Sequence, residues 1–362
     1  MGRVFYIGST GPGSGRSLLA WMLAESLLAR GFQPGFFKCV PDAEEGQDQP
    51  CEDPDLLLFG KLLGQDRARM LWPSPGISST PGEKPISTLE DALTKIQEQA
   101  QAGGCAVVMG SPRIFSDSLS RPISEISLIQ RLRAEVFLLD RYETEANSIY
   151  SMLSVQSLLK GLTRCLIINR IPFPEPAAQL ARVQKLRVHE REMPSIALIP
   201  EDRILSSLSI GEICRCLPAH VLTGGERGIS RISRYSLETR PLQGPLKIFR
   251  HTVGRILLIE PEDKCTTEGA GELLESLAGI LLTGQRSPSP ALIEAAREAG
   301  IALLHCPQDR FAVLDRLQQT LVSVRLEERY KKERFQELIL RDLGIAHILA
   351  CSSFTKDSVG GG

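Results

Sequence analysis

A glycine-rich segment near the start of the chain constrains the fold more than any other feature. An apolar run at 4–7 leads into residues 10–17, Thr-Gly-Pro-Gly-Ser-Gly-Arg-Ser, and then into a segment with helical spacing of apolar residues. In phosphate-binding loops, backbone N–H groups surround phosphate oxygens, a Lys reaches the β- and γ-phosphates, and a following Ser or Thr hydroxyl binds Mg²⁺. Here Ser17 holds its position, but Arg16 replaces the Lys and Thr10 replaces the first glycine. The sequence therefore predicts an anion-binding loop without its usual lysine.

Charge and composition disfavour several classes of protein. The 362 residues carry a formal net charge of −1, which gives no electrostatic case for binding nucleic acid or an anionic membrane surface. No apolar run approaches the roughly 20 residues that span a bilayer, and residues 1–3 lead directly into a strand, so we expect a cytoplasmic protein. The nine cysteines are scattered, which is typical of reduced thiols and gives little support for a metal site.

Short apolar runs separated by helix-length segments predict an α/β fold. The runs lie at 4–7, 35–40, 106–109, 135–139, 165–168 and 195–199. Because their hydrophobicity is continuous rather than alternating, we expect a parallel sheet with helices on both faces. The first helix begins at Ser17 and ends before Gly31, so its N-terminus faces the loop and favours a phosphate there.

A second alternation of strands and helices follows a basic, turn-rich stretch at 221–254. We expect strands at 255–259, 279–282 and 301–304, and helices at 266–277, 290–300 and 311–322. A charged segment with helical spacing covers 326–344. Since 362 residues exceed one ordinary core, we predict a loop-containing domain at 1–215, a smaller α/β domain at 216–325 and a charged helical tail at 326–362.

Several pieces of the chain carry a family resemblance. In the first 215 residues they are 9–17, 35–38, 167–170 and 199–203, and later 260–264, 283–285 and 308–311. In order and spacing the first four resemble the dethiobiotin-synthetase-like P-loop domain of long phosphate acetyltransferases, which also occurs alone. The later three resemble the DRTGG domain that follows it. The resemblance implies a P-loop NTPase-like sheet, an adenine nucleotide such as ATP, and a dimerising, ligand-sensing second domain.

The chain departs from this family at positions that matter for chemistry. Arg16 replaces the loop lysine, and Met109 stands where dethiobiotin synthetases have an acid that serves the metal–nucleotide site. Loss of one preorganised transition-state donor costs about 2.7–4 kcal/mol. Both DRTGG signatures are eroded, and the catalytic acetyltransferase domain, which begins beyond residue 330 in the long proteins, is not recognised. We therefore do not carry acetyl transfer over to this chain.

Several residues have two interpretations each. Lys38 either covers a substrate carboxylate or phosphate, as the resemblance implies, or ends a strand and reaches solvent. By the family pattern Asn169 reads an adenine edge; otherwise it forms a turn. The acidic loop at 42–53 is either a solvated surface or a magnesium or substrate loop, and the loop at 72–85 is a lid or a long connection.

Three charged segments have simpler predicted roles. Residues 201–203 shape a turn after a strand. The arginine series from 227 to 255 is a solvated face, with an acidic partner or nucleotide as the alternative. The helix that includes 327–334 has mixed charges at i,i+4 spacing and is expected to be exposed or to flank a dimer.

These observations favour a nucleotide-binding regulatory protein with little or no ATP hydrolysis, related to the N-terminal regulatory region of phosphate acetyltransferase. The predicted nucleotide-binding residues are Thr10, Gly11, Gly13, Ser14, Gly15, Arg16, Ser17, Lys38 and Asn169, with Ser17 also as a Mg²⁺ ligand and no catalytic residue. The alternatives are an ATP-dependent ligase of the dethiobiotin or cobyrinate amide-forming type, and a structural subunit without a ligand.

The predicted partners are a nucleotide, a second copy of the chain and a regulatory protein, with no nucleic acid and no membrane. We expect the homodimer to form through residues 221–324. The reason is that three strands make a small sheet, and the predicted helix at 290–300 presents Leu292, Ile293 and Ala296 on one face that needs a covering surface.

Overall fold

The chain forms two compact units in a computed structural model, one made of residues 1–202 with 324–362 and the other of residues 203–323. The described residues are 2–41, 53–72, 88–114, 124–159, 161–172, 194–224, 231–232, 234–237, 255–259, 277–298, 300, 302–319 and 324–340. The predicted loops at 42–53 and 72–85 and the motif at 260–264 therefore lie wholly or mostly outside the described residues. Among the described helices, none is long and apolar enough to cross a membrane.

Unit 1 is built on a seven-stranded parallel sheet with the strand order β3-β2-β4-β1-β5-β6-β7. Its strands are β1 (Arg3–Ser9), β2 (Gly35–Lys38), β3 (Ala68–Met70), β4 (Cys105–Met109), β5 (Glu135–Arg141), β6 (Thr163–Ile171) and β7 (Ser195–Pro200). Most strand residues are buried on both faces, as the continuous apolar runs predict. The expected parallel α/β fold is confirmed, and the carboxyl ends of β4, β1 and β5 meet at one edge.

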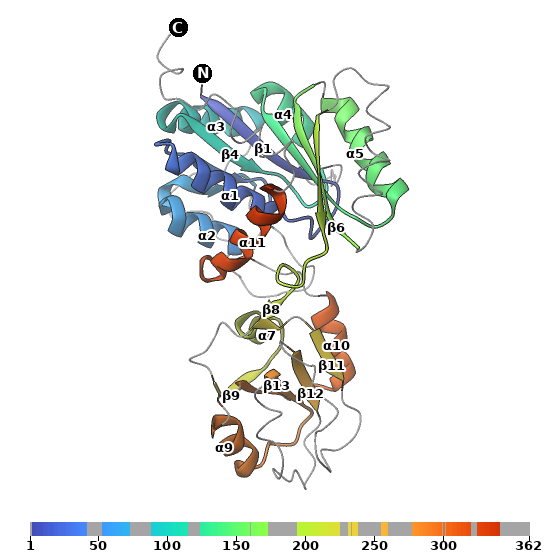
Figure 1. The fold of residues 1–362 in the computed structure, drawn as a ribbon. Coiled ribbons are helices and arrows are strands. Elements are labelled where there is room, and N and C mark those ends of the chain that lie inside the picture. The colour runs from blue at the N-terminus through green and yellow to red at the C-terminus, as the bar shows by residue number, and fades with distance from the viewer. Residues whose placement is uncertain are drawn as a thin grey trace. The chain divides into compact units, whose positions relative to one another are not determined.

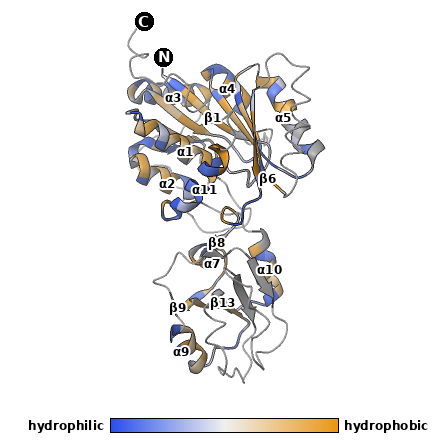
Figure 2. Ribbon diagram, in the orientation of Figure 1, coloured by the Kyte–Doolittle hydropathy of each residue, from blue (hydrophilic) through white to orange (hydrophobic). Residues whose placement is uncertain are grey.

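Helices cover both faces of this sheet (Figure 1). One face carries α1 (Arg16–Ala29), α2 (Pro54–Leu63) and α11 (Arg329–Leu340), and the other carries α3 (Leu89–Gly103), α4 (Glu125–Leu132) and α5 (Glu145–Leu159). The strands of this sheet are mostly hydrophobic, whereas the helices carry both hydrophobic and hydrophilic residues (Figure 2). On the α3–α5 side, buried side chains of every second strand residue form one core with these helices.

The charged helix α11 is partly buried, so the first of our two expectations, an exposed helix, is wrong, while its flanking a dimer stays a prediction. It packs against α1 and β7, and the side chains of Lys331, Lys332 and Phe335 are buried. The ammonium groups are satisfied locally: Lys331 pairs with Glu328 at 2.8 Å and Lys332 with Glu25 of α1 at 2.6 Å. Charged residues at i,i+4 spacing suggested a solvated face, but ion pairs and long aliphatic stems let these lysines be buried.

Unit 2 contains a five-stranded sheet with the order β11-β12-β13-β14-β9, in which β9 is antiparallel to β14. Its elements are β8 (Leu208–Ser209), α7 (Ile210–Cys216), β9 (His220–Thr223), β10 (Arg231–Ile232), β11 (Arg234–Leu237), β12 (Arg255–Ile259), β13 (Leu277–Thr283), α9 (Pro290–Glu298), β14 (Ala302–Cys306) and α10 (Arg310–Gln319). The predicted helix at 266–277 lies outside the described residues except for its last residue, which begins β13. A short 3-10 turn, Leu326–Glu328, precedes α11 in unit 1.

The helix that we expected to need a dimer partner is already covered within unit 2. Leu292 is 7% exposed and Ala296 is 1% exposed, because α9 packs against β14 and β9. The sequence pattern missed β9 and β11, so it underestimated the sheet available to bury this face. The apolar face of α9 therefore gives no argument for a dimer.

Candidate functional site

The predicted phosphate loop lies between the end of β1 and the start of α1. Gly13 and Gly15 adopt positive φ angles of 69° and 101°, a conformation that side chains with a Cβ rarely adopt. Gly15 is the N-cap of α1, and within the described part of the chain no side chain caps this helix end. The first backbone N–H groups of α1 therefore remain available, and with the helix dipole they favour an anion at the loop.

Two buried polar side chains hold the loop in shape from below. Ser9 Oγ lies 2.5 Å from the Gly11 carbonyl oxygen and 2.8 Å from Ser14 Oγ. From β6, Asn169 donates a hydrogen bond of 2.9 Å to the Ser14 carbonyl oxygen, and its own carbonyl accepts one of 2.8 Å from the backbone of Arg170. A carboxamide has two donor and two acceptor sites, and the described residues use one of each.

The entry to the loop is fixed by a carboxylate that sequence analysis did not single out. Asp140, at the end of β5, accepts a hydrogen bond of 2.5 Å from Thr10 Oγ1. Burial raises the pKa of the Asp140 carboxyl, and hydrogen bonds from Thr10 and Ser148 lower the pKa in part. The sequence could have indicated Asp140 by its position, because it directly follows the apolar run at 135–139, and polar residues at such strand ends often line sites. In the structure this strand, β5, is adjacent to β1.

Arg16 turns away from the bulk solvent instead of standing free over the loop. Arg16 is 7% exposed, and its Nη1 donates a hydrogen bond to the carbonyl oxygen of Gly110, just after β4. The neighbouring Met109 is fully buried and pairs with Ile7 of β1 and Lys38 of β2. The guanidinium therefore ties the loop to the adjacent strand, at the position where a P-loop lysine would reach phosphate.

A buried carboxylate does lie near the end of β4, but it serves the interior. Glu125 of α4 accepts hydrogen bonds from the backbone N–H of Ser111, at 3.1 Å to each oxygen, and from the hydroxyl of Tyr6. Burial, with contributions from Cys39 and Glu125, raises the pKa of Tyr6 well above its ordinary value. Tyr6 and Glu125 lie next to Gly110. Because Glu125 is bonded to these interior groups, it does not replace the acid that is missing at Met109.

Ser17 is half-buried in the first turn of α1, where the loop pattern places a Mg²⁺ ligand. Among the residues that the structure describes, no group of three His, Cys, Asp or Glu side chains is arranged to hold a metal ion. Magnesium coordination at Ser17 therefore remains a prediction.

Lys38 is fully buried, so it does not reach solvent as one of our two interpretations had it. Its Nζ lies 2.8 Å from Asp53 Oδ2 and 2.6 Å from Asp55 Oδ2, and both carboxylates are buried as well. Asp53 also caps α2 by accepting from the backbone N–H groups of Asp55 and Leu56. The ammonium group is neutralised by these carboxylates, so Lys38 joins β2 to α2.

Helix α11 covers the outer side of the loop. A Cβ built on Gly15 would lie 2.9 Å from Asn169 Nδ2 and 3.5 Å from the ring of Phe335. Arg334 of the same helix pairs at 2.8 Å with Asp202, which follows β7. Asn169 is only 6% exposed, so the residue predicted to read adenine is largely enclosed in this arrangement.

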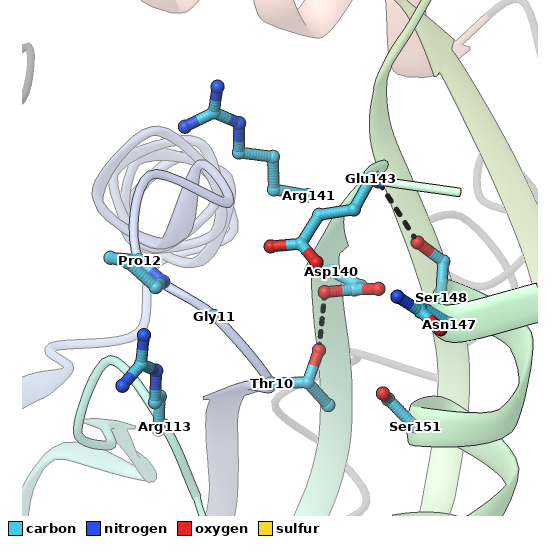
Figure 3. A pocket seen from close by; sticks show the side chains of 10 residues that line it. All are labelled: Thr10, Gly11, Pro12, Arg113, Asp140, Arg141, Glu143, Asn147, Ser148 and Ser151. Atoms are coloured by element: carbon cyan, nitrogen blue, oxygen red, sulfur yellow. Dashed lines mark hydrogen bonds between the residues drawn. The ribbon is translucent and has the colours of Figure 1, made fainter. Parts of the chain in front are cut away.

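A polar pocket of about 140 Å³ opens on the β5 side of the loop (Figure 3). It is lined by Thr10, Gly11, Pro12, Arg113, Asp140, Arg141, Glu143, Asn147, Ser148 and Ser151. Pro12 has no N–H group, so this end of the loop offers one donor fewer to a phosphate. The pocket thus places charged and hydroxyl-bearing side chains beside the predicted nucleotide site.

The motif positions of unit 2 meet at the ends of β13 and β14. Gly284 has a φ of 96°, and its N–H donates to the carbonyl oxygens of Cys306 and Gln308 at 3.1 and 2.8 Å. Asp309 accepts from the backbone N–H of Phe311 at 2.8 Å and directly precedes α10. The third motif position, 260–264, lies outside the described residues.

The fold and the loop define the class: a P-loop NTPase-like α/β unit followed by a smaller α/β domain. Residues 212–320 match the family model of the DRTGG domain. The chain is 22% identical over 359 residues to a phosphate acetyltransferase of Pseudomonas aeruginosa, covering 92% of this chain and 50% of that protein. The chain therefore spans about half the length of this curated relative.

Similar solved structures fall into two groups. The CBS and DRTGG domains of the regulatory region of Clostridium perfringens pyrophosphatase, complexed with the activator diadenosine tetraphosphate, are 23% identical with a TM-score of 0.27, covering 33% of this chain and 49% of that one. The cell-division protein MinD of Aquifex aeolicus is 17% identical with a TM-score of 0.32, covering 56% of this chain and 84% of that one.

Proposed function

We propose that this chain is a nucleotide-binding regulatory protein that holds an adenine nucleotide at loop 10–17 and hydrolyses it slowly or not at all. The observation that carries the proposal is the hydrogen bond of Arg16 to Gly110 in a loop whose backbone otherwise suits phosphate. Anion binding depends mainly on the backbone, whereas phosphoryl transfer depends on groups that stabilise the transition state.

The case for binding comes from the loop itself. Gly13 and Gly15 take the positive φ angles that a tight loop around phosphate requires, and α1 presents uncapped N–H groups among the described residues. Described partners use one donor and one acceptor site of Asn169, so its other two sites can pair with an adenine edge only if the enclosing side chains shift. These features support Thr10, Gly11, Ser14 and the rest of the predicted set as ligand contacts, except Lys38, whose charge is already balanced.

The case against turnover comes from three neighbouring positions. Arg16 uses a donor on Gly110, Met109 supplies no carboxylate for a metal, and Pro12 supplies no N–H group. Each lost preorganised donor typically lowers the rate by about 10²–10³. We infer that a bound nucleotide persists and acts as a signal.

The regulatory role is supported by the relation to half of a phosphate acetyltransferase and by the DRTGG match at 212–320. Activity toward acetyl groups is not part of the proposal. Since a pyrophosphatase regulatory region with a DRTGG domain was crystallised with diadenosine tetraphosphate, that compound joins the nucleotides to be tested.

Calorimetric titration of the full chain with ATP, ADP, AMP, GTP and diadenosine tetraphosphate, with and without Mg²⁺, tests the binding proposal. We expect micromolar or weaker adenine-nucleotide binding that falls at least tenfold in Gly15→Ala, because the new Cβ meets Asn169 at 2.9 Å. Gly31→Ala is the matched control: its φ is also positive, at 81°, but nothing lies within 4 Å of the new Cβ. Absence of nucleotide binding at millimolar concentrations would favour the structural-subunit alternative.

Phosphate release tests the second half of the proposal. We expect ATP hydrolysis near background for the natural chain and partial recovery in the double variant Arg16→Lys, Met109→Glu, which restores a lysine and an acid. Robust turnover by the natural chain would refute the regulatory interpretation and favour the ATP-dependent ligase.

Three further expectations remain part of the proposal: a cytoplasmic location, a regulatory protein partner and a homodimer. Light scattering tests the dimer, and it requires the full chain because α11 completes unit 1. A monomer at micromolar concentration would exclude the dimer.

A further inference from the structure

The pocket beside the loop contains a built polar floor. Asp140 is 7% exposed and Ser148 is 1% exposed, and Thr10 Oγ1 donates to the Asp140 carboxylate at 2.5 Å. Ser151 and Asn147 add a hydroxyl and a carboxamide from the next turns of α5. Because β1, β5 and α5 hold these groups, the floor offers fixed hydrogen-bond partners without reorganisation.

The rim of the pocket carries two exposed arginines. Arg113 and Arg141 are exposed, and neither side chain has a hydrogen bond or ion pair to a described residue. In Figure 3, Arg113 approaches Pro12 from one side of the loop, while Glu143 lies on the opposite side, over Asp140. Guanidinium groups bind carboxylates and phosphates in bidentate fashion, so an anionic group fits this rim.

The lining argues against a nucleobase as the occupant. Among the described lining residues, Pro12 has the only apolar side chain and none is aromatic. A base would find no face for stacking, whereas a hydroxyl or amine would find Asp140, Ser148 and Ser151. A volume of about 140 Å³ suits a small metabolite.

We propose that this pocket binds a second, small ligand with one acidic group, a carboxylate or a phosphate, and at least one hydroxyl. Arg113 holds the acidic group at the rim beside Pro12, and the hydroxyl donates to Asp140 on the floor. The ligand lies against Thr10, Gly11 and Pro12, so its acid adjoins the anion-binding loop.

Calorimetric titration of the full chain, without nucleotide, tests this proposal with L-malate as the carboxylate probe and glycerol 3-phosphate as the phosphate probe. Succinate lacks the hydroxyl and glycerol lacks the acid, so we expect each to bind at least tenfold more weakly than its counterpart. Saturable binding of malate alone or of glycerol 3-phosphate alone supports the proposal and identifies the acidic group. Since no nucleotide is present, the outcome is independent of the proposed function.

Two variants locate the binding. Arg113→Gln removes the rim charge beside Pro12 and Ser151→Val fills the floor, and we expect each to weaken binding about tenfold or more. Arg164→Gln is the control, because this exposed arginine on β6 pairs with Glu135 away from the pocket. Failure of both probes to bind, or binding unchanged in both variants, would overturn the proposal. Glycerol 3-phosphate binding that is lost in Gly15→Ala but kept in Arg113→Gln would place the phosphate in the loop and also overturn the proposal.

Discussion

Replacing Phe335 by Ala tests whether α11 is an integral part of unit 1. The Phe335 side chain is fully buried against the loop region, more than 130 residues after β7 in the sequence. Truncation of a buried Phe to Ala typically costs about 3–5 kcal/mol, because transfer free energy is lost and a cavity is left. Leu340→Ala is the matched control on the same helix, because Leu340 is 40% exposed. For it we expect about 1 kcal/mol or less.

Urea unfolding followed by tryptophan fluorescence isolates the effect on unit 1. Both tryptophans of the chain, Trp21 and Trp72, lie in this unit, and Trp21 Nε1 donates to Glu25, the partner of Lys332. With an m-value of about 3 kcal/mol per molar urea, the expected loss lowers the midpoint by about 1–1.7 M. A midpoint shift in Phe335→Ala no larger than that in Leu340→Ala would refute the packing of α11 on unit 1.

Two further predictions concern buried ionisable groups. Lys38→Met leaves the carboxylates of Asp53 and Asp55 buried without their cation and should destabilise unit 1 by about 3–5 kcal/mol. Adding Asp55→Asn should recover part of this loss. If Lys38→Met alone leaves the free energy of unfolding unchanged, the ion-pair role is contradicted. Burial raises the pKa of Cys105 from 9.0 to about 12. N-ethylmaleimide at pH 9 should therefore modify Cys105 only in unfolded protein. Mass spectrometry can check this, with the partly exposed Cys214 as the reference thiol. Because the folded thiol keeps its proton to higher pH than the unfolded thiol, Cys105 should lower the free energy of unfolding as pH rises from 9 towards 12. Rapid labelling of Cys105 in the native protein would contradict the burial of its thiol.

The architecture of unit 1 was predictable because six of the seven described strands are continuous apolar runs in the sequence. The run at 106–109 is apolar throughout, and the structure buries β4 on both faces. The short edge strand β3 was missed, because three residues with Arg69 between two apolar neighbours carry no such signal. In unit 2 the same lack of apolar continuity concealed β11 within a basic stretch.

The candidate site was only partly predictable, because its remaining members depend on contacts between distant segments. The position of Gly13 and Gly15 in a tight turn between a strand and a helix could be predicted from the loop pattern alone. The enclosure of Gly15 by Phe335 did not, since no local pattern indicates that a charged helix returns to α1. The burial of Lys38 could not be predicted either. Its position at the end of a strand does not show that the carboxylates of Asp53 and Asp55 lie next to it in the fold.

The placement of α11 also determines the order in which the molecule is completed during its synthesis. Residues 203–323 emerge between β7 and α11, which takes about 6–24 s at a translation rate of 5–20 residues per second. During this interval the surface of α1 around Glu25 and the outer side of Gly15 have not yet received their helix. A nascent chain therefore exposes Gly15 and the surface of α1 around Glu25 until α11 has been synthesised and packs against them.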